Sequence, residues 1–307
     1  MSNSQVTAMR LSENNEKSKT TFVTGGSGFI GSRIIKSSPS NIRALVYRKE
    51  VESENIDRVH GDFLSGEHLF EKWIDGVDAI IHTARPSSRN ILGRYWIASR
   101  TRKANTSMVS VVKESTITST LLMHGSLSYG HRGDDLVHTD SILNPVGYAK
   151  AYSIGERPWV DYLHSGGGVK IVRAPWVLGP GSWFEMLYCE EKIPVFGDGS
   201  QWMSLVSVES LADFTWSVLS DEPGVYHPPL LYRCRQSDFA KIVSEIRGVG
   251  TSVVSRSGLT RKYGKMATDS ICSSMRLDDG NGMSSESDSS LEKLVNYLAS
   301  MLGFSNT

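Results

Sequence analysis

A short segment near the start of the chain joins a strand-like run to a glycine-rich turn and then to a helix. Residues 21–24 are β-prone, and the glycines that follow are Gly25, Gly28 and Gly31. The first glycine permits a tight turn, the second lets a phosphate approach the backbone, and the third lets the helix pack on the strand. The N-terminus of the helix then faces the phosphate charge. The segment therefore predicts a dinucleotide-binding βαβ unit.

Strand-like and helix-like segments alternate along the first part of the chain. In chain order, the expected strands and helices are 21–24, 29–39, 42–47, 67–75, 77–82, 94–113, 120–124, 148–164 and 169–173. Strands that are apolar on both faces are typical of a parallel sheet covered by helices on both sides. We therefore expect an α/β fold, a Rossmann-type doubly wound parallel sheet with a smaller C-terminal substrate-binding part. Its functional residues should meet at the C-terminal edge of the sheet.

Changes in composition divide the chain into three parts. Residues 1–19 are predicted to be a disordered leader, because this polar stretch cannot repay the entropy cost of ordering. Residues 20–180 are expected to form the NAD(P)-binding Rossmann domain. Residues 181–307 contain short strands and two predicted helices, 237–247 and 290–302. We expect this last part to form the smaller substrate-binding region and to add elements to the sheet.

Charge and composition argue against several classes of partner. The 33 Lys and Arg residues balance 33 Asp and Glu residues, so the chain has no basic excess for nucleic acid or an anionic membrane. The longest apolar runs are too short to span a membrane, and no secretory signal is visible. The 3 cysteines lie far apart, and no cluster of side chains has the spacing of metal ligands. We expect a cytoplasmic protein that handles a small molecule without a metal.

The residues after the second predicted strand should contact the adenosine ribose of a dinucleotide. A carboxylate there favours NAD, whereas a basic residue accommodates the 2′-phosphate of NADP. Arg48 and Lys49 stand at this place, and Glu50 comes one position later. This order favours NADP(H) as the cofactor, with NAD(H) as the alternative. Arg48 could also be an ordinary charged residue at the end of a strand.

Several motifs follow one another in the order typical of one enzyme group. They are residues 24–31 (TGGSGFIG), 61–63 (GDF), 77–84 (VDAIIHTA), 173–180 (RAPWVLGP), 194–201 (PVFGDGSQ) and 208–212 (VESLA). Over residues 20–250 the chain resembles the extended short-chain dehydrogenase/reductases, which include nucleotide-sugar epimerases, dehydratases and dihydroflavonol-type reductases. The resemblance implies a cofactor site that contains Gly25, Gly28, Phe29, Ile30, Gly31, Arg48, Asp62, Phe63, Thr83, Ala84, Arg85 and Pro175.

The resemblance also implies a catalytic serine, tyrosine and lysine, in which the tyrosine moves a proton while hydride moves to or from the nicotinamide. Tyr148 matches the tyrosine, but the lysine place four residues later holds Tyr152. Lys150 lies roughly 200° around the helix from Tyr148 and should point away. For the serine we favour Ser126, with Gly125 as the alternative occupant of that place. The expected catalytic residues are therefore Tyr148, Ser126 and Tyr152.

Two further departures from the family pattern concern the substrate. Trp176 replaces the asparagine of the RxxN segment, and Met203 stands where family members often carry an arginine that holds a diphosphate. Loss of that cation disfavours a nucleotide sugar. We expect Trp176, Trp183, Met203 and His131 to line a pocket for a small hydrophobic carbonyl or hydroxyl compound, such as a polyketide, terpenoid or aromatic ketone of secondary metabolism. Alternatively, the aromatic residues only pack the smaller part of the chain.

Arg85 stands beside the expected cofactor cleft, where the family carries a small residue. It could bind a substrate anion, clamp a cofactor phosphate or replace the charge of the missing lysine. An ordinary surface salt bridge is the fourth reading, and the sequence leaves all four open.

The first functional hypothesis is an atypical NADP-dependent reductase or dehydrogenase with Tyr148 as the proton donor. One alternative is a catalytically impaired NADP-binding protein that regulates or binds a partner. The other is a non-redox isomerase or dehydratase that uses the same cavity. Because family members often dimerise through the helices equivalent to 94–113 and 148–164, the resemblance also makes a homodimer an expectation.

Overall fold

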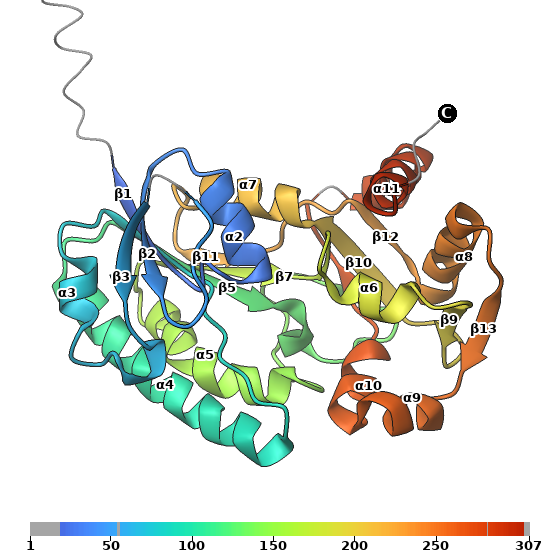
Figure 1. The fold of residues 1–307 in the computed structure, drawn as a ribbon, viewed down its shortest axis with the longest axis horizontal. Coiled ribbons are helices and arrows are strands. Elements are labelled where there is room, and N and C mark those ends of the chain that lie inside the picture. The colour runs from blue at the N-terminus through green and yellow to red at the C-terminus, as the bar shows by residue number, and fades with distance from the viewer. Residues whose placement is uncertain (1–18, 54–55, 281, 304–307) are drawn as a thin grey trace, which may run out of the picture.

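The computed structural model describes residues 19–53, 56–280 and 282–303 (Figure 1). Apart from residue 19, the predicted leader lies outside these residues. A parallel seven-stranded sheet with the order β11-β7-β5-β4-β1-β2-β3 forms the centre of the larger part. In chain order its strands are β1 (Thr20–Thr24), β2 (Asn41–Val46), β3 (Ile56–His60), β4 (Ala79–His82), β5 (Ser119–Gly125), β7 (Val169–Ala174) and β11 (Gly224–Tyr226).

The direction in which strands are added to the sheet reverses between β1 and β4. From β1 the chain moves outward to β2 and β3, and then returns to add β4, β5, β7 and β11 on the other side. This order confirms the predicted Rossmann-type doubly wound sheet. Such a switch point leaves a crevice at the carboxyl ends of the two central strands, where ligands bind. The glycine turn follows β1 and residues 83–87 follow β4, so both segments reach this crevice.

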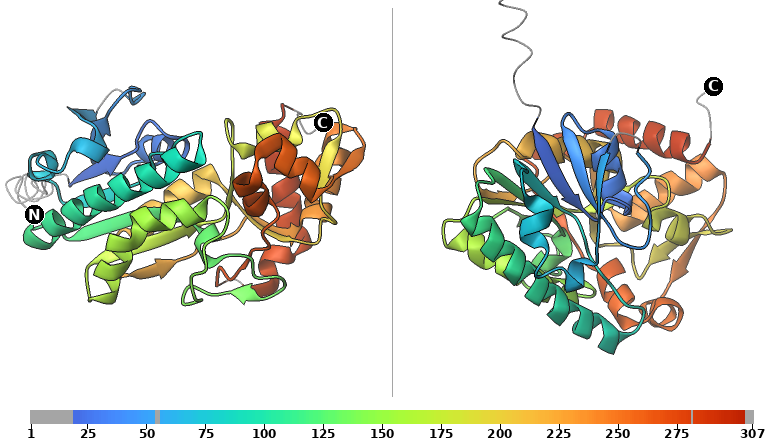
Figure 2. Two further views of the ribbon diagram at one scale, coloured as in Figure 1. Left: turned by 90° about the horizontal axis from the view of Figure 1, so that it is seen from below. Right: turned by 60° about the vertical axis from the view of Figure 1, so that its left-hand side comes forward.

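Helices cover both faces of the large sheet, because side chains alternate between the faces along each strand. Val23 and Ile81 belong to the core shared with α2 and α7, whereas their neighbours Phe22 and Ile80 belong to the core shared with α3, α4 and α5. Helices α4 and α5 lie side by side on one face (Figures 1 and 2). The five helices are α2 (Phe29–Lys36), α3 (Phe70–Ile74), α4 (Ile91–Glu114), α5 (Ala149–His164) and α7 (Val208–Val218).

The smaller part lies beside the carboxyl end of the large sheet (Figure 2). Its core is rich in aromatic side chains. The rings of Phe184, Tyr188 and Phe239 pack on one another with centroids 5.0–6.2 Å apart. Its strands are β6 (Leu136–Val137), β8 (Trp176–Leu178), β9 (Ile193–Phe196), β10 (Trp202–Ser207), β12 (Tyr232–Arg235), β13 (Thr251–Val254) and β14 (Arg276–Leu277). Its helices are α6 (Trp183–Tyr188), α8 (Gln236–Arg247), α9 (Arg256–Tyr263), α10 (Lys265–Ile271) and α11 (Asp288–Met301).

The late part of the chain matches the sequence expectations in some elements and adds others. Helices α8 and α11 confirm the two helices predicted there. Helix α7 and strand β11 lie beyond residue 180 in the sequence, yet they complete the cover and the edge of the large sheet. Strand β3 was not predicted, because its sequence Ile-Asp-Arg-Val-His is largely polar and forms the opposite edge. In the described residues no helix is both long and apolar enough to cross a membrane.

Candidate functional site

The turn after β1 brings the three predicted glycines together. Gly25 has a φ of +74°, and a Cβ there would lie 2.7 Å from the backbone nitrogen of Ala84. A Cβ on Gly31 would collide with the carbonyl oxygen of Gly25, which accepts a hydrogen bond from the N–H of Gly28 at 2.9 Å. The turn itself therefore requires glycine at 25 and 31. Gly28 differs, because a Cβ there would meet only the Gly25 oxygen, at 3.1 Å.

The helix that follows the turn has no side-chain cap at its N-terminus. Helix α2 begins at Phe29, and its N-cap residue Gly28 offers no side-chain acceptor. The backbone N–H groups of Phe29, Ile30 and Gly31 therefore have no partner within the helix. Such a terminus stabilises an anion by its free donors and by the helix dipole. Together with the open space at Gly28, it forms a cradle that fits a pyrophosphate.

Hydrogen bonds hold the ends of β1 and β4 together at the crevice. The Thr24 hydroxyl lies 2.6 Å from Nδ1 of His82 and accepts from the N–H of Ala84 at 3.3 Å. The Thr83 hydroxyl donates to the Thr24 carbonyl oxygen at 2.7 Å. Burial lowers the pKa of His82 to about 4, so its ring is neutral at pH 7. Thr83 and Ala84 thus present a fixed backbone beside the glycine turn.

The basic residues predicted to contact the ribose lie beyond the end of β2. Arg48 is exposed, and its guanidinium carbon lies 4.8 Å from the centroid of the Tyr47 ring. Within the described parts of the chain, no carboxylate forms an ion pair with Arg48. Its charge is therefore available to a phosphate.

The other predicted cofactor residues make contacts within the protein. The Asp62 carboxylate accepts from the N–H of Leu64 at 3.0 Å and caps a short 3₁₀ turn. Phe63 is buried, with its ring 4.8 Å from that of His82. Pro175 is half-buried between β7 and β8. These contacts account for all three residues without a ligand, so their cofactor role stays a prediction.

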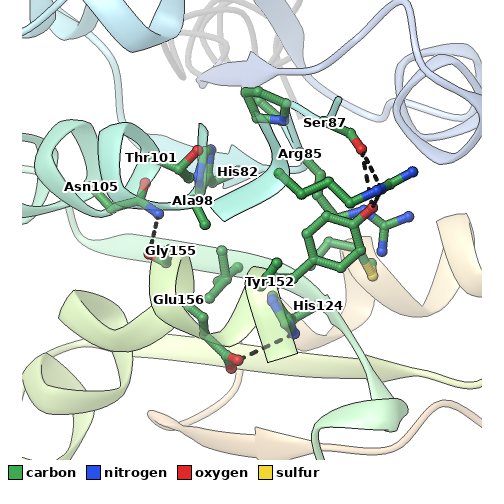
Figure 3. A pocket seen from close by; sticks show the side chains of 16 residues that line it. His82, Arg85, Ser87, Ala98, Thr101, Asn105, His124, Tyr152, Gly155 and Glu156 are labelled. Atoms are coloured by element: carbon green, nitrogen blue, oxygen red, sulfur yellow. Dashed lines mark hydrogen bonds and ion pairs between the residues drawn. The ribbon is translucent and has the colours of Figure 1, made fainter. Parts of the chain in front are cut away.

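A pocket opens beside the crevice at the carboxyl ends of β4 and β5 (Figure 3). Its walls come from β4 and the segment after it, from β5, and from the facing sides of α4 and α5. Ala98, Leu122 and Ala151 give the wall apolar surface. The cavity volume is about 30 Å³. The pocket therefore admits a small chemical group.

Two tyrosines and two arginines form a cluster, of which Arg85, Arg94 and Tyr152 line this pocket and Tyr148 does not. The guanidinium carbon of Arg85 lies 4.5 Å from the ring centroid of Tyr152, and that of Arg94 lies 4.5 Å from the ring centroid of Tyr148. The two tyrosine rings are 6.5 Å apart. Arg94 Nη1 donates to the Tyr152 hydroxyl at 3.2 Å and to the Ser87 hydroxyl at 2.8 Å. The place of the family lysine thus holds a tyrosine whose hydroxyl accepts a hydrogen bond from an arginine of α4.

Tyr148 lies at the start of α5, and the nearby lysine belongs to a different pocket. The N–H of Tyr148 donates to the Ser270 hydroxyl at 3.0 Å, which ties the helix start to α10. Lys150 lines a second pocket of about 250 Å³, together with His131 and Arg256. It is absent from the described residues that line the pocket at Tyr152. The positive charge at the Tyr152 pocket therefore comes from arginines.

The two candidates for the serine place differ in their surroundings. Ser126 begins a 3₁₀ turn, is 5% exposed, and is absent from the described lining of both pockets. Gly125 ends β5, and a Cβ added there would meet no atom within 4 Å. Gly125 is likewise absent from the described lining of both pockets, so Ser126 stays the prediction and Gly125 its alternative. With Gly125 at the family's serine place, the site would have no serine hydroxyl there.

A buried ionic group lies directly beneath Tyr152 and was not predicted from the sequence (Figure 3). Nδ1 of His124 lies 3.2 Å from a carboxylate oxygen of Glu156, whose other oxygen pairs with Arg173. The three side chains are 9%, 1% and 2% exposed. Burial lowers the pKa of His124 to about 4, although the Glu156 carboxylate opposes the shift. His124 lines the pocket as a neutral ring.

The four residues predicted to hold the substrate lie away from this pocket. Trp176 and Trp183 pack on each other with centroids 4.5 Å apart, and Met203 is 2% exposed within the aromatic core. His131 accepts from the N–H of Ser274 at 3.0 Å and faces the second pocket. Among the described residues, none of these four lines the pocket at Tyr152. The described part of the chain contains no group of three or more His, Cys, Asp or Glu side chains that could hold a metal ion.

Arg94, Ser87 and His124 are the site residues that sequence reasoning missed. Each is a single residue outside any motif, and only the fold brings it to Tyr152. Of the three, only Arg94 could have been suspected from the sequence, because it is a cation on the helix that the sequence predicts over residues 94–113. The position of that helix relative to Tyr152 requires the structure.

Comparisons with known proteins agree with this fold. The sequence profile of the NAD-dependent epimerase/dehydratase family matches residues 21–227. A search of curated proteins found no matching relative.

Several solved structures share the fold. UDP-glucose 4-epimerase from Thermotoga maritima, with UDP-glucose, has a TM-score of 0.72 at 16% identity and covers 92% of this chain and 98% of its own. A human epimerase family protein with NADPH has a TM-score of 0.72 at 14% identity, over 92% and 99% of the two chains. A dTDP-glucose 4,6-dehydratase from Bacillus anthracis, with NAD, has a TM-score of 0.71 at 15% identity, over 93% and 96%. Because the family profile matches more than half of its residues, the chain belongs to the NAD-dependent epimerase/dehydratase family.

Proposed function

We propose that this protein binds NADP(H) along the glycine turn and reduces a small, largely apolar carbonyl compound, or oxidises the corresponding alcohol, with Tyr148 as the proton donor. The observation that carries the proposal is the pairing of an intact phosphate cradle at Gly25–Gly31 with Tyr148 beneath a guanidinium. The two features lie at the carboxyl edge of one sheet, where a cofactor and a substrate can meet.

The cradle and the strand ends support a nicotinamide dinucleotide as the cofactor. A Cβ at Gly28 would occupy space that is otherwise open beside the uncapped start of α2, so this surface suits a pyrophosphate. Arg48 is exposed and has no ion-pair partner among the described residues, which supports NADP(H) over NAD(H) because a guanidinium binds the 2′-phosphate. Proteins of similar fold have been solved with either cofactor, the human epimerase family protein with NADPH and the bacterial dehydratase with NAD.

A bound nicotinamide supplies or accepts the hydride, and the chain must move one proton. In the reductive direction the Tyr148 hydroxyl gives its proton to the carbonyl oxygen of the substrate and becomes a phenolate. The Arg94 guanidinium, 4.5 Å from that ring, compensates the negative charge that develops there. Solvent then returns a proton to Tyr148. Arg94 thereby takes over the electrostatic role that lysine has in the family pattern.

The apolar wall and the small volume of the pocket indicate which class of substrate it suits. Its wall is apolar at Ala98, Leu122 and Ala151, and its volume of about 30 Å³ suits a small group. The buried Met203 offers no cation for a diphosphate. Both features favour a compact apolar carbonyl or hydroxyl compound over a nucleotide sugar.

The surroundings of Gly125 favour a second candidate, a protein that binds the cofactor without turning it over. Without a serine hydroxyl, the substrate carbonyl would lose one of the groups that polarise it. A cofactor-loaded protein of this kind would act by binding a partner.

A titration followed by an activity assay separates the two candidates. Purified protein should bind NADPH in a calorimetric titration, and aromatic or aliphatic ketones should then cause loss of the absorbance of the reduced nicotinamide. Tyr148→Phe removes only a hydroxyl, so we expect unchanged NADPH affinity and turnover lowered by about 100-fold or more. NADPH binding with no turnover on any ketone would favour the partner-binding protein. Absence of NADPH binding as well as of turnover would overturn both candidate functions.

A further inference from the structure

The mouth of the pocket at Tyr152 carries an excess of positive charge. Arg85 and Arg94 both line it, and the Ser87 hydroxyl lies between the Tyr152 and Arg94 side chains. The one carboxylate among the described lining residues is Glu156, which is 1% exposed and already paired with Arg173. Anything that enters the pocket therefore meets two guanidinium groups whose charge is not balanced locally.

Arg85 has no acidic partner among the described residues. No described carboxylate lies within 4.0 Å of its guanidinium or of that of Arg94. By contrast, the surface arginines Arg43, Arg157 and Arg256 each pair with an aspartate. An arginine at a pocket mouth without a partner is available to bind an anion from outside the protein.

The cluster holds Arg85 in a defined position. Its guanidinium lies over the face of the Tyr152 ring, which leaves the N–H groups at the guanidinium edge free. The Tyr152 ring is itself fixed, because Arg94 donates to its hydroxyl at 3.2 Å and the Ser87 hydroxyl lies 3.3 Å away. A planar guanidinium presents its N–H groups in a fork that matches a carboxylate. Tyr152 thus forms a fixed platform under the Arg85 guanidinium.

We propose that Arg85, supported by Arg94 and Ser87, binds a carboxylate of the substrate, so that the substrate is an apolar carbonyl compound that carries a carboxylate a few bonds from the reacting carbon. This inference rests on the proposed function for its reaction but not for its binding site. The ring of Tyr152 lies 6.5 Å from that of Tyr148, so the carboxylate and the carbonyl belong to one small molecule. A keto acid with an aromatic or aliphatic body has this chemistry.

Matched pairs of compounds test the carboxylate site directly. The probes are benzoylformate and its methyl ester, titrated into the protein saturated with NADP⁺ so that no hydride is transferred. We expect the acid to bind about tenfold or more tightly than the ester, because only the acid can accept a charge-assisted bidentate bond. Arg85→Met should abolish the difference, and Arg85→Lys should restore part of it. Arg89→Met, at an exposed position that does not line the pocket, serves as the control and should preserve it.

The outcomes distinguish this inference from the proposed function. Equal affinity for acid and ester, with NADPH turnover intact, would overturn the carboxylate site and leave the reductase proposal standing. A strong preference for the acid without any turnover would support the site and count against the reductase. If Arg85→Met instead weakens NADP⁺ binding tenfold and leaves the acid-to-ester ratio unchanged, Arg85 binds a cofactor phosphate and the inference is wrong. Tighter binding of phenyl phosphate than of benzoylformate would also overturn the assignment to a carboxylate.

Discussion

The glycine turn and the tyrosine pocket lie at the same edge of the sheet, yet they follow the family pattern to different extents. At the turn, Gly25, Gly28 and Gly31 all stand where the motif requires them, and the backbone leaves no room for alternatives at 25 and 31. At the pocket, the lysine place holds Tyr152 and Gly125 borders the open space of the serine place. Phosphate binding depends on backbone shape, which few substitutions preserve. Proton transfer depends on side-chain charge, which a different residue can supply from another helix.

The sharpest way to test this comparison is to substitute two glycines of the same turn. Gly31→Val puts carbon atoms against the Gly25 carbonyl, so we expect about 3 kcal/mol lower free energy of unfolding together with loss of NADPH binding. Gly28→Ala meets only one oxygen at 3.1 Å, so the fold should persist while NADPH affinity falls about 100-fold or less. Denaturant unfolding and calorimetric titration measure the two effects. Full NADPH affinity in Gly28→Ala would mean that no phosphate lies at this cradle.

Each region contains one buried neutral histidine, His82 at the turn and His124 at the pocket, and this makes stability depend on pH. Burial lowers the pKa of both rings from 6.5 to about 4. Between these values the unfolded chain binds more protons than the folded one, so the free energy of unfolding falls as pH falls from 6.5 to about 4. The loss should be roughly 3 kcal/mol for each histidine. Denaturant unfolding across this pH range should show the slope, and His124→Gln should remove about half of it.

Restoring the family lysine tests whether the positive charge beside Tyr148 has been lost or is supplied by Arg94. Tyr152→Lys places an ammonium group beside Tyr148, so oxidation of an alcohol should reach half of its maximal rate at a pH about one unit lower. Tyr152→Gln, which adds no charge, is the control. A pH profile identical to that of the unchanged protein would show that Arg94 already supplies all the charge that Tyr148 can use.

The smallest expected effect comes from restoring the serine hydroxyl. A side chain at Gly125 meets no atom within 4 Å, so Gly125→Ser should leave the free energy of unfolding within about 0.5 kcal/mol. If this is the serine place, the new hydroxyl should raise kcat up to about tenfold with little change in KM. Gly125→Ala is the matched control without a hydroxyl. Equal kcat for the serine and alanine variants would move the serine role back to Ser126.

The sequence was sufficient for the parts of the molecule that depend on local signals. The glycine spacing predicted the turn, and short apolar strands alternating with helices predicted the doubly wound sheet, because each signal can be read along the sequence. Strand β3 was not predicted, because an edge strand needs little apolar surface. Arg94 and His124 were not predicted as site residues, because only the fold brings α4 and β5 together beside Tyr152. The predicted pocket residue Met203 shows the converse, since its apolar side chain packs in the core of the smaller part.

A calorimetric titration of the unchanged protein with NADPH and, separately, with NADH shows whether the glycine turn holds a cofactor. We expect one NADPH per chain, bound about tenfold or more tightly than NADH, because the exposed Arg48 has no ion-pair partner among the described residues and can bind the 2′-phosphate. Arg48→Met should bring the two affinities together. Absence of binding for both nucleotides would contradict the central claim that the glycine turn still holds a cofactor beside a modified catalytic pocket.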